Sequence, residues 1–192
     1  MRLAGKKPPG RQVLALLLVG TGLILLGIAS FLILPKPGAS AQKSDSTVYA
    51  IPVAVDFPAP DLDLLDLQKR PAALSDYAGK VVLVNNWATW CPPCKAEMPT
   101  LEAYYQDYLA QDFVIVAIEA GEPAEEVAEF VRQYGLSFPV WPDPEYSSQT
   151  AFKNDALPSS YVIDRQGQVR LAWVGPISRE LLEQYVTPLL EE

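Results

Sequence analysis

The sequence predicts an α/β domain in which helices flank a central mixed β-sheet, preceded by one N-terminal transmembrane helix. Two observations predict this fold class. Short apolar runs typical of buried strands alternate with stretches of helical periodicity, and the last two strands follow one another around a glycine. A separate run of 22 residues without charge lies near the N-terminus. The 192 residues, 49% hydrophobic and 20% charged, are enough for one ordinary domain and this extra segment.

The uncharged run covers residues 13–34, and a helix of that length matches a hydrocarbon core of about 30 Å. Four basic residues precede it and only Lys36 follows closely. We therefore expect a single-pass protein of the cell membrane, with its N-terminus in the cytoplasm and the rest outside. A cleavable signal peptide is the alternative, because residues 39–41 have the form of a cleavage site. The apolar run exceeds the usual length of a signal peptide, which favours an uncleaved anchor.

We expect four parts in the chain: a cytoplasmic basic tail over residues 1–12, the transmembrane anchor, a flexible linker over 35–50, and a folded domain over 51–192. Beyond Lys36 the chain carries ten Lys and Arg residues against 23 Asp and Glu residues, a net charge of −13. This charge disfavours nucleic acid as a partner, and solubility is its simplest explanation.

The first half of the domain contains the pattern for a hairpin, a strand and a helix. Residues 62–67 have leucines in near-alternating order, which suggests an edge strand or hairpin. Residues 81–84 predict a short buried strand, and residues 95–111 predict a helix with an aromatic and aliphatic face. Pro99 is expected to break or kink this helix, because it removes a hydrogen bond and collides with the carbonyl of Lys95.

Residues 113–118 form a continuous apolar run, as expected for a strand covered on both faces in a parallel sheet. A crossover helix should follow, with Pro123 at its first helical position and Gly135 as its end. Residues 139–141 then suggest a short strand and residues 145–154 a modest helix.

The end of the chain predicts a hairpin and a last helix. Residues 160–164 and 168–174 predict antiparallel strands joined around Gly167, which supplies a turn position that needs a positive φ. Ser178 should cap the last helix, and Pro188 should disturb its final turn.

Cys91 and Cys94, which are the only cysteines, lie between the predicted strand and the predicted helix. A thiolate at the positive end of a helix is stabilised by the helix dipole and by unpaired backbone N–H groups, so Cys91 should have a lowered pKa and be the better nucleophile. Pro92 and Pro93 carry no N–H. The first donors that can reach the Cys91 sulfur are therefore the N–H groups of Cys94 and Lys95.

Three other interpretations of the cysteine pair are less favoured than redox chemistry. Half of a zinc site would require two chains, because the chain has no histidine and no second cysteine pair. A permanent structural disulfide would enclose only two residues and remove little entropy from the unfolded chain. An inert buried pair would not need the two prolines. Thiol-disulfide exchange, without a cofactor, is the favoured chemistry.

Residues 81–99, VVLVNNWATWCPPCKAEMP, resemble the active-site segment of the thioredoxin-like, membrane-anchored TlpA/ResA/DsbE group. The similarity extends loosely over residues 57–190. It implies a thioredoxin-like fold, with Cys91 as the attacking thiolate and Cys94 as the resolving thiol. A departure is Asn86, where this group usually has an apolar aromatic residue.

The resemblance also implies a role: reduction of protein disulfides outside the cytoplasm, typically those of apocytochrome c before haem attachment. Electrons would come from a membrane thiol transporter. The group places a cis-proline at the position of Pro158, before a strand that faces the cysteines. The residues expected to bind substrate are Trp90, Pro92, Pro93, Leu157 and Pro158.

Glu97 is the expected base for Cys94, because it follows that residue by three positions and lies on nearly the same helix face. It matches the acidic residue of the TlpA/ResA-like pattern, and Asn85 stands where ordinary thioredoxins carry a buried aspartate that accepts a proton. The alternative is a carboxylate that only stabilises the start of the helix through the helix dipole.

Two other functions remain as alternatives. A thiol peroxidase would resemble peroxiredoxins in having threonine three residues before its reactive cysteine, and that position is Ala88 here. A tethered thioredoxin-like binding module without turnover would not reduce the disulfides of insulin, which distinguishes it from an oxidoreductase.

Overall fold

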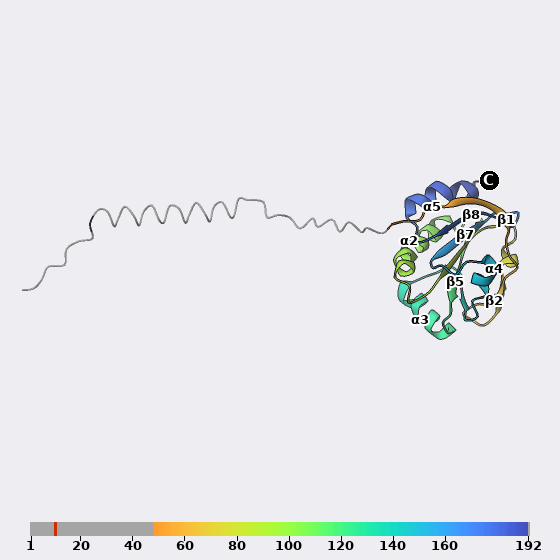
Figure 1. Cartoon of the computed structure of the whole chain (residues 1–192), viewed down its shortest axis with the longest axis horizontal. Helices are drawn as coiled ribbons and strands as arrows, with labels where there is room; N and C mark the ends of the chain where they lie inside the picture. Colours follow the sequence, from red (N-terminus) through yellow and green to blue (C-terminus); the bar gives the residue numbers. More distant parts are fainter. Residues whose placement is uncertain (1–9, 11–47, 192) are drawn as a thin grey trace, which may run out of the picture. The chain divides into compact units, whose positions relative to one another are not determined.

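The computed structural model describes residue 10 and residues 48–191 (Figure 1). The predicted anchor over 13–34 lies outside the described residues, as does nearly all of the predicted basic tail and linker. Among the helices within the described part of the chain, none is both long and apolar enough to span a membrane.

A six-stranded mixed sheet forms the centre of the domain, as predicted (Figure 1). Its strand order is β1-β8-β7-β4-β5-β6. The strands β4, β5 and β6 are parallel, and β7, β8 and β1 continue the sheet with antiparallel pairing. The strands are β1 (Val53–Pro58), β4 (Val81–Trp87), β5 (Phe113–Ala120), β6 (Val140–Asp143), β7 (Ser159–Ile163) and β8 (Gln168–Val174).

A second, two-stranded sheet joins β2 (Asp63–Leu65) to β3 (Pro71–Ala73), and the 3₁₀ helix η1 (Leu74–Tyr77) follows it. The hairpin expected around residues 62–67 is thus confirmed. Strand β1 was not predicted. It lies at the edge of the main sheet and its residues are mostly exposed. Val53, Val55 and Phe57 alternate with smaller or polar residues, so the available signal for this strand was missed.

Helices cover both faces of the main sheet. Apolar residues of α2, α3 and α5 share one buried cluster with β4 and β5, while α4, η1 and the small hairpin contribute to a second cluster on the opposite face. The helices are α2 (Pro92–Tyr108), α3 (Ala124–Tyr134), α4 (Ser147–Phe152), α5 (Arg179–Tyr185) and α6 (Thr187–Leu190).

The apolar runs in the two central strands are fully buried, and alternate residues serve the two faces. Leu83 of β4 belongs to the cluster that contains Met98 and Leu101 of α2. Its neighbour Val84 belongs to the cluster that contains Phe152 of α4. Burial of each such side chain stabilises the fold by about 1.5–3 kcal/mol, so this pattern fixes the positions of β4 and α2 on which the cysteines lie.

Helix α2 differs from its prediction in two ways. It begins at Pro92 instead of residue 95, and it continues through Pro99 without a break. Pro99 is exposed, whereas Met98 and Leu101 beside it are completely buried. The apolar contacts of both halves of the helix therefore outweigh the hydrogen bond that the proline removes.

The predicted ends of the other helices are partly confirmed. Pro123 is the N-cap of α3 and not its first helical residue, while Gly135 ends α3 in the left-handed conformation with φ 65°. The Ser178 hydroxyl accepts a hydrogen bond from the backbone of Leu181 and caps α5, as predicted. Pro188 lies inside a separate short helix, α6. The helix α5 already ends at Tyr185, so Pro188 does not lie in its final turn.

Candidate active site

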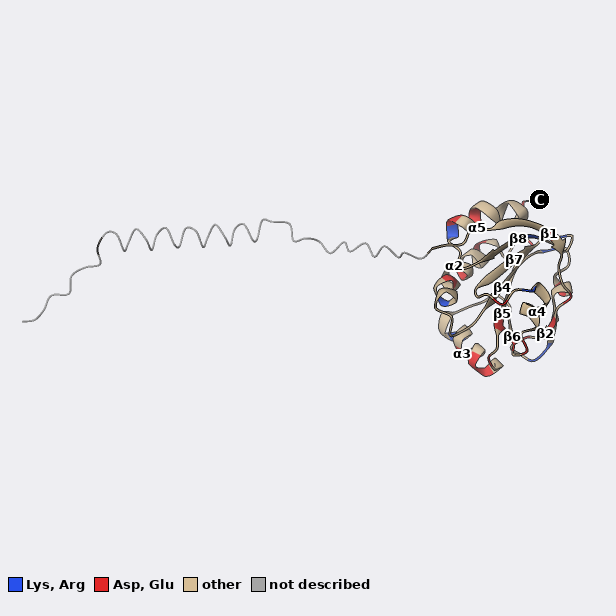
Figure 2. Ribbon diagram, in the orientation of Figure 1, with Lys and Arg blue, Asp and Glu red and all other residues tan. Residues whose placement is uncertain are grey.

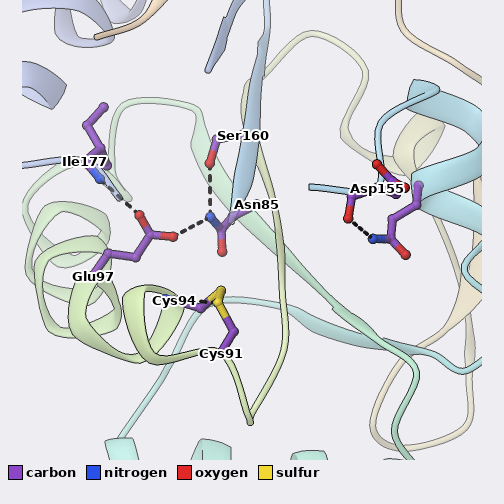
Figure 3. Close-up of a disulfide and its surroundings, with 8 residues drawn as sticks. Asn85, Cys91, Cys94, Glu97, Asp155, Ser160 and Ile177 are labelled. Carbon is purple, nitrogen blue, oxygen red and sulfur yellow. Dashed lines mark hydrogen bonds between the residues drawn. A yellow bond between two sulfur atoms is a disulfide. The ribbon is translucent and has the colours of Figure 1, made fainter. Parts of the chain in front are cut away.

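The two cysteines lie at the start of α2 and form a disulfide (Figure 3). Cys91 is the N-cap residue, and its sulfur accepts a hydrogen bond of 3.3 Å from the backbone N–H of Cys94, as predicted. The second predicted donor does not reach the sulfur. The N–H of Lys95 instead donates to the carbonyl oxygen of Cys91 at 3.1 Å, because this is the first regular hydrogen bond of the helix.

The cysteines differ in their surroundings. Cys94 is completely enclosed, whereas Cys91 borders a groove of about 920 Å³ at the surface. Incoming disulfides can therefore reach Cys91 first. Because Cys91 also faces the end of α2, the structure brings together the access and the electrostatic stabilisation that an attacking thiolate needs.

The groove runs between the segment around Cys91 and the helix α4. Trp90, whose surface is 62% exposed, forms one wall. The lining includes one basic residue, Lys153, and one acidic residue, Asp155, so its charge is nearly balanced. Many other acidic residues lie elsewhere, for instance on α3 and α5 (Figure 2). The residues that line the groove are Trp90, Cys91, Pro92, Pro93, Tyr146, Gln149, Thr150, Lys153, Asn154, Asp155 and Leu157.

Four of the five residues predicted to bind substrate thus border the same groove as Cys91. The fifth, Pro158, is buried and follows Leu157 directly in the chain. The Leu157–Pro158 peptide bond is cis, as predicted. The carbonyl of Pro158 accepts a hydrogen bond of 2.8 Å from Gly175, which attaches this segment to the end of β8.

Glu97 is buried on α2, with only 1% of its surface exposed. Asn85 donates a hydrogen bond from Nδ2 to Glu97 Oε1 at 2.9 Å, and the backbone N–H of Ile177 donates to Oε2 at 3.1 Å (Figure 3). Burial outweighs both hydrogen bonds and raises the pKa of Glu97 to about 8. A carboxyl group with this pKa can bind and release a proton near neutral pH, which a solvated carboxylate at a helix terminus cannot do.

Asn85 occupies the space between Glu97 and the sheet. Its Nδ2 also donates to Ser160 Oγ at 3.0 Å, and its Oδ1 is buried without a hydrogen-bond partner among the residues that the structure describes. In Figure 3 this oxygen points in the direction of the disulfide. The Asn85 amide thus orients the Glu97 carboxyl group through Nδ2, while its oxygen is directed to the cysteines.

A second buried carboxyl group, Glu119, was not predicted. It lies at the end of β5 and accepts a hydrogen bond from the backbone N–H of Glu122 at 3.1 Å. The Glu122 carboxylate in turn accepts a hydrogen bond from the hydroxyl of Thr89, two residues before Cys91. Burial and then the nearby Glu122 raise the pKa of Glu119 to about 8. An acidic residue directly after the apolar run 113–118 was the available signal.

The tight turn after β5 brings this carboxyl pair close to the groove. Gly121 has a φ of 97°, and a side chain there would collide with Tyr146 of the groove wall. Glycine is therefore required at this position for two reasons, its backbone conformation and the contact with Tyr146.

Comparisons with known proteins identify the family of the chain. The profile of the AhpC/TSA family matches residues 55–172. The thiol-disulfide oxidoreductase ResA of Geobacillus kaustophilus is 38% identical over 134 residues, which covers 70% of this chain and 77% of that protein. ResA of Bacillus anthracis is 38% identical over 128 residues, covering 67% and 74%.

Solved structures show the same architecture. A Chlorobium tepidum structure described as a thiol:disulfide interchange protein DsbE has a TM-score of 0.66 and 31% identity, over 70% of this chain and 96% of that chain. A thioredoxin family thiol:disulfide interchange protein of the same organism has a TM-score of 0.63 and 29% identity, over 72% and 99%. The chain therefore belongs to the AhpC/TSA family and, within it, to the thioredoxin-like thiol-disulfide oxidoreductases that include ResA.

Proposed function

We propose that the protein is a membrane-tethered reductase of protein disulfides that acts outside the cytoplasm. The observation that carries this proposal is the position of Cys91 at the N-terminus of α2, where it borders an open groove while Cys94 is enclosed behind it. A groove of this size beside the attacking sulfur suits a segment of a protein substrate better than a small peroxide.

The reaction begins when the Cys91 thiolate attacks one sulfur of a substrate disulfide. That S–S bond breaks, a mixed disulfide forms, and the other substrate sulfur leaves as a thiolate that takes up a proton from water. Cys94 then attacks the Cys91 sulfur and releases the second substrate thiol. Two electrons pass from the dithiol to the substrate, and the Cys91–Cys94 disulfide of this structure is the product. An external dithiol donor must reduce it again.

Glu97 takes the proton of Cys94 in the second step. Its pKa of about 8 is close to that of an ordinary thiol, which allows proton transfer between the two groups near neutral pH. Asn85 and the N–H of Ile177 hold the carboxyl group in place.

The substrate segment lies in the groove, in contact with Trp90, Pro92, Pro93 and Leu157. Pro158, which is buried, follows Leu157 directly and restricts the positions that Leu157 can take in the lining. The lining of the groove has a nearly balanced charge. The substrate is therefore selected mainly by contacts with apolar and neutral polar groups, and less by the electrostatic field of the acidic domain.

Apocytochrome c is the substrate, and a membrane thiol transporter is the electron donor. The resemblance of residues 81–99 to the TlpA/ResA/DsbE group supports both partners. The uncharged run over 13–34 and the basic residues before it support the membrane anchor and the orientation. The disulfide substrate and the dithiol donor would then both meet the domain at the outer surface of the membrane.

Trapping tests the proposal. A Cys94→Ala variant of the full chain should retain its substrate as a mixed disulfide on Cys91, and mass spectrometry of the trapped complexes should identify apocytochrome c. A Cys91→Ala variant is the matched control and should trap no substrate. Trapping of proteins without a haem-attachment motif would overturn the assignment of the substrate while leaving the exchange chemistry intact.

A further inference from the structure

Asn86 is a buried polar residue on β4 that the exchange chemistry does not use. Only 1% of its surface is exposed, and it follows Asn85 directly. Neighbouring residues of a strand point to opposite faces of the sheet, so the two amides serve different faces. Each is paired with a serine of the antiparallel strand β7: Asn85 lies opposite Ser160, and Asn86 lies opposite Ser159.

The Asn86 amide connects three segments of the chain. Its Oδ1 accepts a hydrogen bond of 2.6 Å from the hydroxyl of Ser148 in α4. Its Nδ2 donates to the hydroxyl of Ser159, the residue after Pro158, at 3.4 Å. All three polar side chains are buried, with at most 1% of each residue exposed. The amide thus fixes α4 and the start of β7 to the same point of the central strand.

The N-terminus of α4 is held by a further buried residue. Asp143, at the end of β6, accepts hydrogen bonds from the backbone N–H groups of Ser147 at 3.0 Å and Ser148 at 2.8 Å. These bonds define where the helix begins. Because the backbone and the hydroxyl of Ser148 are both bonded, the rotation of α4 is fixed as well as its position.

These segments form the groove beside Cys91. Tyr146, Gln149 and Lys153, on α4 and its two ends, line the groove, and Leu157, the residue before Pro158, lines it as well. On the exposed side, Gln149 also donates a hydrogen bond to the carbonyl of Asp155 at 3.0 Å. The connection through Asn86 joins both segments at buried side chains, where water cannot replace it.

We propose that Asn86 is a positioning residue that sets the distance between α4 and the Leu157–Pro158 segment, and so determines which protein substrates fit the groove. This inference rests on the proposed function of the groove as the place where the substrate segment binds. It assigns different roles to the two neighbouring amides. Asn85, through Glu97, serves the thiol chemistry, and Asn86, through Ser148 and Ser159, serves substrate docking.

The physical basis is the cost of an unpaired buried hydroxyl. If Asn86 is replaced by an apolar residue, Ser148 and Ser159 lose their partner in a place that water does not reach. Helix α4 has only six residues and can recover the lost hydrogen bond by rotating Ser148 toward solvent. Such a rotation would displace the groove wall without moving Cys91, which lies on a different element.

The test compares a protein disulfide with a small disulfide, using the full chain. Ser148→Ala removes the connection with little change in volume, and Asn86→Leu removes it from the strand side. Ser147→Ala, on the same helix and without a hydrogen bond from its hydroxyl among the described residues, is the matched control. Reduction of insulin, driven by dithiothreitol, gives kcat and KM. The reaction of the reduced protein with 5,5′-dithiobis(2-nitrobenzoic acid) gives the intrinsic rate of exchange.

We expect Ser148→Ala and Asn86→Leu to raise the KM for insulin by about 5- to 10-fold, with kcat and the rate with the small disulfide within about 2-fold of wild type. The double variant should be no worse than the stronger single variant, because both changes remove one connection. Amide hydrogen exchange in α4 should become faster. Asn85→Leu should instead slow the reaction with both disulfides.

An equal loss with insulin and with the small disulfide, or no change in KM, would overturn the positioning role. If Asn86→Leu does not fold, Ser148→Ala carries the test alone. A wild-type protein that reacts with the small disulfide but does not reduce insulin would overturn the proposed function, and the docking role with it. The positioning role alone fails if the wild-type protein reduces insulin and the variants reduce it with the same KM.

Discussion

Asn85 and Glu97, twelve residues apart in the sequence, are joined by a buried hydrogen bond of 2.9 Å between Asn85 Nδ2 and Glu97 Oε1. The bond connects the end of β4 to the second turn of α2 and is drawn above the disulfide in Figure 3. Burial keeps the Glu97 carboxyl group mostly protonated at neutral pH, and this hydrogen bond fixes its orientation. The role of Glu97 as the base for Cys94 is therefore open to a direct test.

Replacement of Glu97 by glutamine should slow disulfide exchange by about 10²-fold, the lower end of what a positioned base contributes. It should also lower the thiol pKa values, because the carboxylate no longer repels the thiolates. Glutamine can still accept the hydrogen bond from Asn85 or Ile177, so the domain should stay folded. Stopped-flow exchange and thiol titration against pH measure both effects. Unchanged titration and an unchanged rate would show that Glu97 is not the base.

The stability of the oxidised protein should fall as the pH rises from about 4.5 to about 8. Glu97 and Glu119 have pKa values of about 8 in the folded protein, above the ordinary value of 4.5. Their protonated forms therefore favour the folded state, and this contribution is complete below pH 4.5 and is lost as the pH passes through 8. Urea unfolding should show a decrease of at least about 1 kcal/mol between about pH 6 and about pH 9.

Glu119→Gln provides the control for this pH dependence, because the amide does not ionise. The variant should lose less stability than the wild type over the same pH interval, while its exchange rate with a small disulfide stays similar. A wild-type protein that is equally stable at both ends of this interval would contradict the raised pKa of both carboxyl groups.

Cys91 should react before Cys94 when the reduced protein is alkylated. Its sulfur accepts the N–H of Cys94 at the positive end of α2 and borders the groove, whereas Cys94 is enclosed. Iodoacetamide labelling at several pH values, followed by peptide mapping, gives the rate for each cysteine. Preferential labelling of Cys94 would reverse the roles of the two residues.

Pro99→Ala should stabilise the domain by about 1–3 kcal/mol, because α2 is continuous through this exposed position and alanine can restore the missing hydrogen bond to Lys95. The midpoint of urea unfolding measures the effect. Ala96, which is also exposed on α2, offers the opposite control, since Ala96→Gly should destabilise the helix by about 1 kcal/mol. A less stable Pro99→Ala protein would indicate that the proline is required for the shape of α2.

The predicted topology can be tested on cells. If residues 13–34 form an uncleaved anchor with the domain outside the cytoplasm, protease added to spheroplasts should remove the domain. Protection of the domain, or a mature protein that starts at Gln42 and does not sediment with membranes, would contradict this arrangement.

The sequence by itself determined most of the order of the strands and helices, the cysteine pair and its expected nucleophile. These properties depend on local features that can be identified from neighbouring residues: apolar runs of strand length, Gly135 and Ser178 at helix ends, and two prolines between the cysteines. The cis bond before Pro158 and much of the case for Glu97 came from the resemblance of the motif, since neither follows from local spacing alone.

Only the tertiary structure decided the environment of the polar residues in the core. Glu97, Glu119 and Asn86 are ordinary polar residues in the sequence, and their properties depend on partners that are 3 to 80 residues away, such as Glu122, Ser148 and Ile177. Burial raises the pKa of a carboxyl group only when the packed fold removes water from it. The same packing keeps α2 continuous through Pro99, because long-range apolar contacts outweigh the local tendency of proline to break a helix.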